Sequence, residues 1–428
     1  MLKIILLLFL PLSLFSSNIK IASYNVENLF DMSYNGHEYQ EYTPHKHNWT
    51  DKIFKKKLLN ISEVICELNA DIIGLQEIEN KNVLKKLQQT LTRVGCNYKY
   101  SAITHKKQSA IQVAILSRIP FKNKKELVVN GTLGYRNILE VKFSFNGNLF
   151  FVFVNHWKSK RSKESYRILS AKRLMKRLNT LPKGSEYIIL GDFNSDYDEF
   201  QHLELKHNDS HGKTGINHYL KTINSQEKFI RPFLFKEKEI EHYNLWLEVE
   251  NYKRWSHNFY GNKQALDAII LPSTLFNGKG LEYIKNSFDV FKKSYLFHKK
   301  GYIFRWEYKH KKHQGKGYSD HLPIVATFST DKAFKKLNNN GLHINTIDRL
   351  LSKEILLPIL LKKVKVISRE KKKAIITDRN TKKNISIYGI KNTLQLNKYY
   401  DIAVYKQKFY KGQYEIIDFE IEKRYDSE

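Results

Sequence analysis

The chain repeats one pattern, in which a short run of apolar residues ends in polar side chains. The pattern occurs four times in chain order, at residues 19–28, 71–77, 150–157 and 187–194. Short apolar runs bounded by polar residues are typical of buried strands. Each run therefore predicts a strand that carries amide, carboxylate or imidazole groups to its end.

Two further apolar runs are associated with acidic residues. Residues 322–325 predict a strand directly after Asp320 and His321, and residues 265–271 predict a strand with Asp267 inside it. A buried carboxylate without a partner is costly. Asp267 is therefore expected to have a partner, and a histidine is the natural one.

Helical periodicity appears between these strands. Residues 50–68 place apolar side chains at helical spacing, and Thr50 can cap the first turn. Residues 162–178 predict a basic helix, and residues 139–145 and 149–154 predict a hairpin. Strands that alternate with helices and hairpins predict an α/β fold.

Asp320 and His321 stand side by side in a tight polar turn at a strand entrance. This pairing suits metal-assisted hydrolysis, in which a carboxylate binds or orients and an imidazole moves a proton. His321 is the candidate general base, with Asp267 holding its other ring nitrogen. An ordinary histidine pKa of about 6.5 leaves the imidazole neutral at working pH.

Glu77 is the strongest candidate metal ligand, because its carboxylate is at the end of a rigid predicted strand. Hard oxygen donors favour Mg²⁺, with Mn²⁺ or Ca²⁺ as alternatives. The chain has only two cysteines, Cys66 and Cys96, and they form no zinc pattern. Their spacing leaves open whether they pair with each other.

Three short motifs follow one another in the sequence: Leu-Gln-Glu at 75–77, Gly-Asp-Phe-Asn at 191–194 and Ser-Asp-His at 319–321. Any one of them has an ordinary structural explanation, such as an Asx turn. In this order they resemble the endonuclease/exonuclease/phosphatase superfamily, which includes DNase I-like nucleases, abasic-site endonucleases, bacterial sphingomyelinases and inositol phosphatases. The resemblance covers about residues 18–330, and its details are most similar to the secreted bacterial nuclease branch.

The resemblance implies a four-layer sandwich of two mixed β-sheets flanked by helices, with the active site at one edge. It places Asn25 and Asp320 near the metal, beside Glu77. It also places Asp192 and Asn194 against the scissile phosphate, where they position the nucleophile.

The same resemblance implies that His156 contacts the phosphate and assists the leaving group. Arg136 matches a position that grips phosphate and binds substrate. The chain departs from the family pattern at Ala268, where relatives often carry a larger or polar residue. The acidic partner of His156 has no clear counterpart in this chain, and Gln112 is only a loose candidate.

The first 17 residues have the layout of a secretory signal peptide: a lysine, an apolar run from position 4 to 15, and two serines. They predict a secreted or periplasmic protein. The formal net charge is +30, which attracts polyanions such as nucleic acid or acidic membranes. Biased base composition is an alternative source of part of that charge.

Residues 291–306 interleave aromatic and basic side chains. This pattern suits base stacking with phosphate contact, entry into a lipid interface, or a hairpin packed on its own domain. In the last case His298, His310 and His313 are expected to be ordinary surface residues.

The family-like region, 18–330, is expected to end in a linker at residues 331–344. Five short alternating segments within residues 345–428 then predict a small basic β-barrel, OB-like in fold. Its charge and its aromatic residues suit either a nucleic-acid accessory domain or a structural cap.

These observations favour an exported, monomeric, divalent-metal-dependent nuclease that cleaves phosphodiester bonds of DNA, with RNA as the alternative nucleic acid. A secreted phospholipase C of the sphingomyelinase kind is the alternative, with residues 291–306 in contact with membrane. It uses the same catalytic set, so that set cannot separate the two. A non-catalytic binding protein is disfavoured by the completeness of the set.

Overall fold

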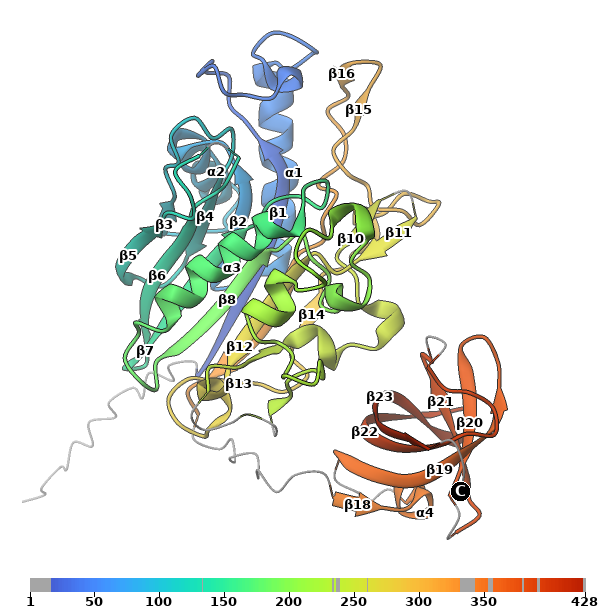
Figure 1. Ribbon diagram of the computed structural model, residues 1–428. Helices are drawn as coiled ribbons and strands as arrows, with labels where there is room; N and C mark the ends of the chain where they lie inside the picture. The colour runs from blue at the N-terminus through green and yellow to red at the C-terminus, as the bar shows by residue number, and fades with distance from the viewer. Residues whose placement is uncertain are drawn as a thin grey trace, which may run out of the picture.

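The computed structural model describes residues 17–132, 134–232, 235, 239–259, 261–331, 343–352, 357–378, 381–390 and 393–425 (Figure 1). The apolar run of the predicted signal peptide lies outside this part of the chain, as does most of the predicted linker. Export and the linker boundaries therefore stay predictions.

Two β-sheets pack face to face in the larger part of the molecule. The first has the strand order β13-β17-β1-β2-β4-β3, with β14 beside β17. Its strands are β1 (Asn18–Leu29), β2 (Ile72–Ile78), β3 (Tyr100–Ile103), β4 (Gln112–Ser117), β13 (Glu282–Tyr283), β14 (Asp289–Val290) and β17 (Ile324–Ser329). The second has the order β5-β6-β7-β8-β12-β9. Its strands are β5 (Phe121–Leu127), β6 (Ile138–Phe145), β7 (Asn148–His156), β8 (Glu186–Asp192), β9 (His242–Asn244) and β12 (Asp267–Pro272).

The inner faces of the two sheets approach closely at Gly74 of β2. A Cβ atom at this position would lie 2.4 Å from the Leu190 side chain of β8, so a larger residue would force that side chain to move. Apolar residues of both sheets form one continuous core. This close packing brings the ends of β1, β2, β7 and β8 to the same edge of the sandwich.

Helices cover both outer faces of the sandwich, as predicted. Helices α1 (Asp51–Leu68) and α2 (Lys81–Arg93) pack against the first sheet. Helix α3 (Glu164–Leu178) lies over the second, where Arg177 pairs with Glu140 of β6 at 2.6 Å. Thr50 caps α1 by accepting a hydrogen bond from the Ile53 amide, as its sequence indicates.

Short elements connect the strands. Two small hairpins are formed by β10 (His257–Phe259) with β11 (Asn262–Gln264) and by β15 (Tyr308–Lys309) with β16 (Lys312–His313). Single helical turns occur at Gln40–Tyr42, Glu199–Gln201, Leu205–His207, Gly215–Tyr219, Leu245–Glu248, Asn251–Lys253, Ser273–Phe276 and Ser294–Leu296.

The aromatic and basic segment 291–306 is anchored in the protein core by Trp306. Its indole is 2% exposed, and its N–H donates to His313 Nδ1 at 3.0 Å. His313 is itself 1% exposed and packs against Tyr42 and Trp49. The expectation that His313 is a surface residue is wrong, because the β15–β16 hairpin folds it into this aromatic cluster.

The C-terminal part has its own hydrophobic core. Its elements are β18 (His343–Asn345), α4 (Ile347–Leu351), β19 (Ile359–Arg369), β20 (Lys373–Thr377), β21 (Asn384–Tyr388), β22 (Tyr399–Tyr410) and β23 (Gln413–Tyr425). Five of these strands are the ones that the sequence predicts. They follow one another in a ring, β19-β20-β21-β23-β22, and β22 pairs back to β19.

The prediction of a closed barrel needs correction. Strands β21 and β23 pair in parallel through only two residue pairs, Ser386 with Glu415 and Ile387 with Ile416. Such a short contact leaves the ring weakly joined at this point. The domain is therefore a ring-like sheet rather than a closed barrel.

Charged residues join the C-terminal sheet to the sandwich. Arg231 donates to both carboxylate oxygens of Asp418 on β23, at 3.0 and 3.2 Å. The same guanidinium stacks on Tyr405 at 3.7 Å and lies 3.5 Å from Glu420. Arg254 adds a second guanidinium 3.5 Å from Asp418.

Within the described residues, no helix is long and apolar enough to cross a bilayer. Cys66 and Cys96 are both free thiols. Burial and the neighbouring Cys96 raise the pKa of the Cys66 thiol to about 12.

Candidate active site

The predicted site residues come together at one edge of the sandwich, because the strands that carry them end there. Strands β1 and β2 run parallel, as do β7 and β8. In the second sheet His156 is opposite Asp192, and Asp192 is opposite Asp267. Asp320 and His321 enter from the turn before β17.

Glu77 is aimed into this edge by an irregularity of β2. The strand register shifts between Gln76 and Ile78, and Glu77 has a φ of 67°. A bulge of this kind redirects one side chain out of the regular alternation. Positive φ is uncommon for a residue other than glycine and is often found at functional sites.

One amide links the two carboxylates at the centre of the cluster. Asn25 Nδ2 donates to Glu77 Oε1 and to Asp192 Oδ2, each at 3.0 Å. The backbone N–H of Asn28 donates to Glu77 Oε2 at 2.8 Å. His156 Nε2 lies 3.5 Å from Asp192 Oδ2 and 3.8 Å from Glu77 Oε1.

His321 and Asp267 form the expected pair. His321 Nδ1 lies 2.7 Å from Asp267 Oδ2. The Ser256 hydroxyl donates to the same oxygen at 2.6 Å, and the Trp246 indole donates to the Asp267 carbonyl at 2.6 Å. The imidazole is therefore held at Nδ1, while Nε2 faces Asp192 Oδ2 at 3.9 Å.

Arg136 and Asn194 meet at one backbone carbonyl. Arg136 donates to Trp157 O at 3.0 Å, and Asn194 Nδ2 donates to the same oxygen at 3.2 Å. Both side chains therefore lie at the edge where the resemblance places the phosphate. Gln112 lies elsewhere, since its hydrogen bonds go to residues 104, 106 and 109.

The structure adds residues to the site that the sequence analysis does not single out. Arg305 Nε donates to Glu27 Oε1 at 2.9 Å and its guanidinium lies 3.3 Å from Asp320 Oδ2. Lys57, completely buried, donates to the Glu27 carbonyl. His257 faces His321, with ring centroids 4.7 Å apart.

The electrostatics of the cluster follow from burial of many carboxylates. Burial raises the pKa of Asp192 to about 7 although His321 opposes the shift. Burial and the charge of Asp320 raise the pKa of Glu77. Burial and Asp320 likewise raise the pKa of Glu27 to about 7, despite Arg305.

The pKa values of the two central histidines, His321 and His156, are shifted in opposite directions. Burial opposes a charge on His321, but Asp267 and Asp192 outweigh it and raise its pKa well above the ordinary value. Burial, with Arg136 and His321 as positive neighbours, lowers the pKa of His156 well below the ordinary value. His156 Nδ1 is buried and has no hydrogen-bond partner among the described residues.

This donor set fits a hard divalent cation. Carboxylate and imidazole atoms lie within 4.8 Å of one another in groups that include Glu77 with His156 and Asp192, and His257 with Asp320 and His321. The predicted ligands Glu77 and Asp320 are thus in two neighbouring groups. Carboxylate oxygens are what Mg²⁺, Mn²⁺ and Ca²⁺ prefer, and which ion binds is open.

Comparison with solved structures finds similar chains at low sequence identity. D. rerio TDP2, humanized by 14 mutations, is 14% identical, with 74% of this chain and 100% of that chain covered and a TM-score of 0.47. An endonuclease/exonuclease/phosphatase family protein from Leptotrichia buccalis is 16% identical. The match covers 73% of this chain and 99% of that chain, with a TM-score of 0.43. A protein of the same family from Bacteroides thetaiotaomicron is also 16% identical. The match covers 73% of this chain and 98% of that chain, with a TM-score of 0.43.

No curated protein matches the chain. The sequence pattern of the Endonuclease/Exonuclease/phosphatase family, however, matches residues 20–330. That range contains both sheets of the sandwich and the whole acid–histidine cluster at its edge. The chain therefore belongs to the endonuclease/exonuclease/phosphatase family, and has its phosphodiesterase and nuclease fold.

Proposed function

We propose that the protein is an exported, divalent-metal-dependent nuclease that hydrolyses phosphodiester bonds of DNA, with RNA as a second substrate. The observation that carries the proposal is the His321–Asp267 pair, 2.7 Å apart, facing Asp192 inside a carboxylate-rich cluster. The formal net charge of +30 supports a polyanionic substrate. N-terminal sequencing of the protein after expression with its first 17 residues tests export.

His321 is the proposed general base, and it acts once its imidazole has lost its proton. In the metal-free protein Asp267 and Asp192 hold the pKa of His321 well above its ordinary value, so the expectation of a neutral imidazole does not hold there. A divalent cation beside these carboxylates would lower that pKa. Asp267 holds Nδ1, so Nε2 is the atom that accepts a proton. Asp192 Oδ2, at 3.9 Å from Nε2, is too far for a direct hydrogen bond. A water held between these two atoms would lose its proton to Nε2 and attack phosphorus, while Asp192 orients it.

Glu77 and Asp192, with Asn25 and Asp320 beside them, are the residues that would hold the cation. A bound divalent ion supplies positive charge to the phosphate oxygens and to the developing charge of the transition state. The raised pKa values of Glu77 and Asp192 support this assignment, because they indicate carboxylates that lack enough positive charge nearby.

The leaving oxygen and the phosphate face the other side of the cluster in this proposal. Asn194 and Arg136 meet at the Trp157 carbonyl, and the Arg136 N–H groups that do not contact this oxygen would donate to phosphate oxygens. The Asn194 amide donates to Trp157 O and to Asp192 Oδ2, so it holds Asp192 in place beside the phosphate. His156, neutral because its pKa is low, donates one N–H near the leaving oxygen. It stabilises charge there rather than delivering a proton from an imidazolium.

The phospholipase alternative gains no support from Trp306. Trp306, the residue that a membrane-contact test would change first, is 2% exposed and packs on Trp49. It would have to leave the core to enter a lipid interface. The catalytic atoms themselves serve either phosphodiester.

A plasmid-nicking assay tests the proposal. The chain without its first 17 residues is incubated with supercoiled DNA in Mg²⁺, in Mg²⁺ with Ca²⁺, and in EDTA. Cleavage is expected with metal only, and His321→Ala is expected to reduce it by about 10²–10⁴-fold. His105→Ala, at an exposed histidine, is the matched control and should keep full activity.

Two results would contradict the proposal. Cleavage that continues in EDTA would contradict the requirement for a metal ion. Full activity in His321→Ala would contradict the role of His321 as the general base. Absence of cleavage with DNA and RNA, together with hydrolysis of sphingomyelin vesicles, would favour the phospholipase.

A further inference from the structure

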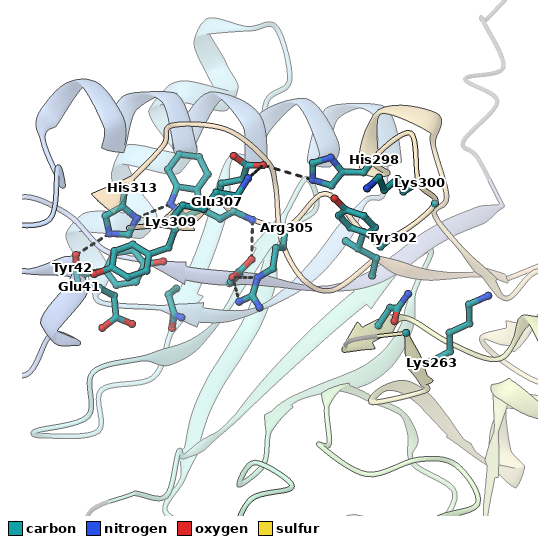
Figure 2. Close-up of a pocket in the computed structure, with 18 residues that line it drawn as sticks. Glu41, Tyr42, Lys263, His298, Lys300, Tyr302, Arg305, Glu307, Lys309 and His313 are labelled. Atoms are coloured by element: carbon teal, nitrogen blue, oxygen red, sulfur yellow. Dashed lines mark hydrogen bonds and ion pairs between the residues drawn. The ribbon is translucent and has the colours of Figure 1, made fainter. Parts of the chain in front are cut away.

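A second cavity lies next to the catalytic cluster, and the mechanism above does not use it. Its volume is about 900 Å³, near the upper end of the range of about 300–1,000 Å³ that ligand pockets occupy. Its walls come from the end of β1, from the β10–β11 hairpin and from residues 298–313 (Figure 2). These segments are far apart in the sequence.

The cavity shares a wall with the catalytic site. Glu27, Asn28 and Arg305 line it, and Asn28 donates to Glu77 at 2.8 Å. Arg305 lies 3.3 Å from Asp320. A group in the cavity is therefore one residue away from the carboxylates that would hold the metal.

One end of the cavity combines an available aromatic ring with basic side chains. Figure 2 shows His298, Lys300, Tyr302 and Lys263 at this end, and Arg305 between them and Glu41 at the other end. Tyr302 is 47% exposed, and its ring centroid lies 4.4 Å from that of His298. Within the described part of the chain, no ion pair is found for either lysine.

Two acidic residues of the cavity, Glu27 and Glu307, already have basic partners. Glu27 is paired with Arg305. Glu307 lies 2.9 Å from Lys309 Nζ and 3.7 Å from His298 Nε2. The basic end therefore presents positive charge that the neighbouring carboxylates do not cancel.

We propose that this cavity binds one unpaired nucleotide of the substrate strand beside the scissile phosphate. The base stacks on Tyr302, and the backbone phosphate contacts Lys263 and Lys300. Any base can stack on an aromatic ring, but a base inside a duplex has both faces covered by its neighbours. The inference rests on the proposed nuclease function and adds to it a preference for single-stranded or locally unpaired substrate.

Binding tests the cavity without depending on cleavage. His321→Ala protein, without metal, is titrated with a fluorescent single-stranded oligonucleotide. Adding Tyr302→Ala is expected to weaken binding roughly 10-fold, the loss expected when a base loses its aromatic platform. Tyr302→Phe keeps the ring and should bind normally, as should Tyr34→Ala, at a tyrosine outside the cavity that is 70% exposed.

The lysines and the duplex give independent readouts. Lys263→Ala and Lys300→Ala are each expected to reduce the slope of log affinity against log salt by about 0.7, the value for one single-strand phosphate contact. A fully paired duplex of the same sequence should bind more weakly and show no response to Tyr302→Ala. A duplex that binds equally well, with the same response, would overturn the preference for an unpaired base.

Cleavage separates this inference from the function it rests on. With metal, Tyr302→Ala should lower kcat/KM roughly 10-fold on the oligonucleotide and leave methyl p-nitrophenyl phosphate unaffected, since the group that stays on that phosphate is a methyl group and has no ring to stack on Tyr302. Equal losses on both substrates, or no loss on either, would overturn the cavity assignment while the nuclease function stands. Tyr302-dependent binding without any cleavage of nucleic acid by the unaltered protein would refute the nuclease and leave the cavity assignment intact.

Discussion

Two buried clusters of charge in this molecule are built differently. At the joint with the C-terminal sheet, Arg231 and Arg254 meet Asp418 and Glu420, and Arg231 also stacks on Tyr405. Positive and negative groups are in equal number there. The carboxylates raise the pKa of Arg231 although its burial opposes this, so the guanidinium stays charged. Burial raises the pKa of Glu420, and Arg231 opposes that shift.

The catalytic edge buries more negative than positive groups. Its acidic residues are Glu27, Glu77, Asp192, Asp267 and Asp320. Arg305 and His321 are the cations in direct contact with them. Because burial of an uncompensated carboxylate favours its protonated form, the pKa of Asp192 rises to about 7.

The difference distinguishes a structural joint from a binding site. A cluster with equal numbers of positive and negative groups needs no added ion, and it holds the C-terminal sheet against the sandwich. A cluster with excess negative charge is stabilised when a cation binds to it. The following predictions test this contrast, from the largest expected effect to the smallest.

Asp267→Asn is expected to have the largest effect. The amide keeps the size of the side chain but removes the charge that holds His321 Nδ1 at 2.7 Å, so the imidazole loses its preferred orientation. The rate constant kcat should fall by about 10²–10⁴-fold, with KM nearly unchanged. Asp418→Asn at the joint is the matched change, and steady-state hydrolysis of a small phosphodiester should be unaffected by it.

Arg231→Ala should break the joint and leave the site intact. It leaves Asp418 and Glu420 buried with less compensation, and removing one partner of a buried pair costs about 3–5 kcal/mol. Urea unfolding and limited proteolysis should both detect the loosened C-terminal sheet. Lys228→Ala is the control, because its pair with Glu422 is about a quarter exposed on each side and such pairs are worth roughly 0–1 kcal/mol. A loss of metal binding in Arg231→Ala would contradict the separation of the two clusters.

The dependence of stability on pH is the smallest effect when it is counted per pH unit, at most about 1.4 kcal/mol for each carboxylate. Folding raises the pKa of Asp192 from 3.8 to about 7 and that of Glu27 from 4.5 to about 7. The folded state therefore binds these protons more tightly, and the stability they contribute is complete below pH 4 or so and lost as pH rises to about 7. Metal-free protein should become easier to unfold over this window.

Chemical unfolding at several pH values, in EDTA and in Mg²⁺, measures this slope. Mg²⁺ should oppose the loss near pH 7, where both carboxylates are needed as anions. Glu186→Gln is the control: burial raises the pKa of Glu186 to about 7 as well, but it lies beside Leu281, away from the site. That variant should flatten part of the slope without changing the response to Mg²⁺.

The sequence predicts the strands and most of the site because both depend on local patterns. Apolar runs that end in polar residues identify β1, β2, β7 and β8, and the costly position of Asp267 predicts its histidine partner. Arg305 and Lys57 could not be found in this way. Arg305 reaches Glu27 across 278 positions, and Lys57 looks like one of several lysines on an amphipathic helix.

The C-terminal sheet gives the same lesson. All five of its predicted strands are present, since alternation is a local signal. Closure of the ring depends on how β21 meets β23, and a two-pair contact between strands distant in sequence leaves no local trace. The prediction for His313 is wrong for the same reason, because its aromatic neighbours Tyr42 and Trp49 come from the N-terminal part of the chain.

Thermal unfolding during a Mg²⁺ titration tests the central claim most directly. The unaltered protein should be stabilised with increasing Mg²⁺, by about 2.7 kcal/mol at 100 times the dissociation constant. Glu77→Gln, which keeps the shape of the side chain and removes its charge, should lose most of this response while melting normally without metal. An equal response of both proteins, or no response of the unaltered protein to Mg²⁺, Mn²⁺ or Ca²⁺, would contradict the claim that a divalent cation completes this site.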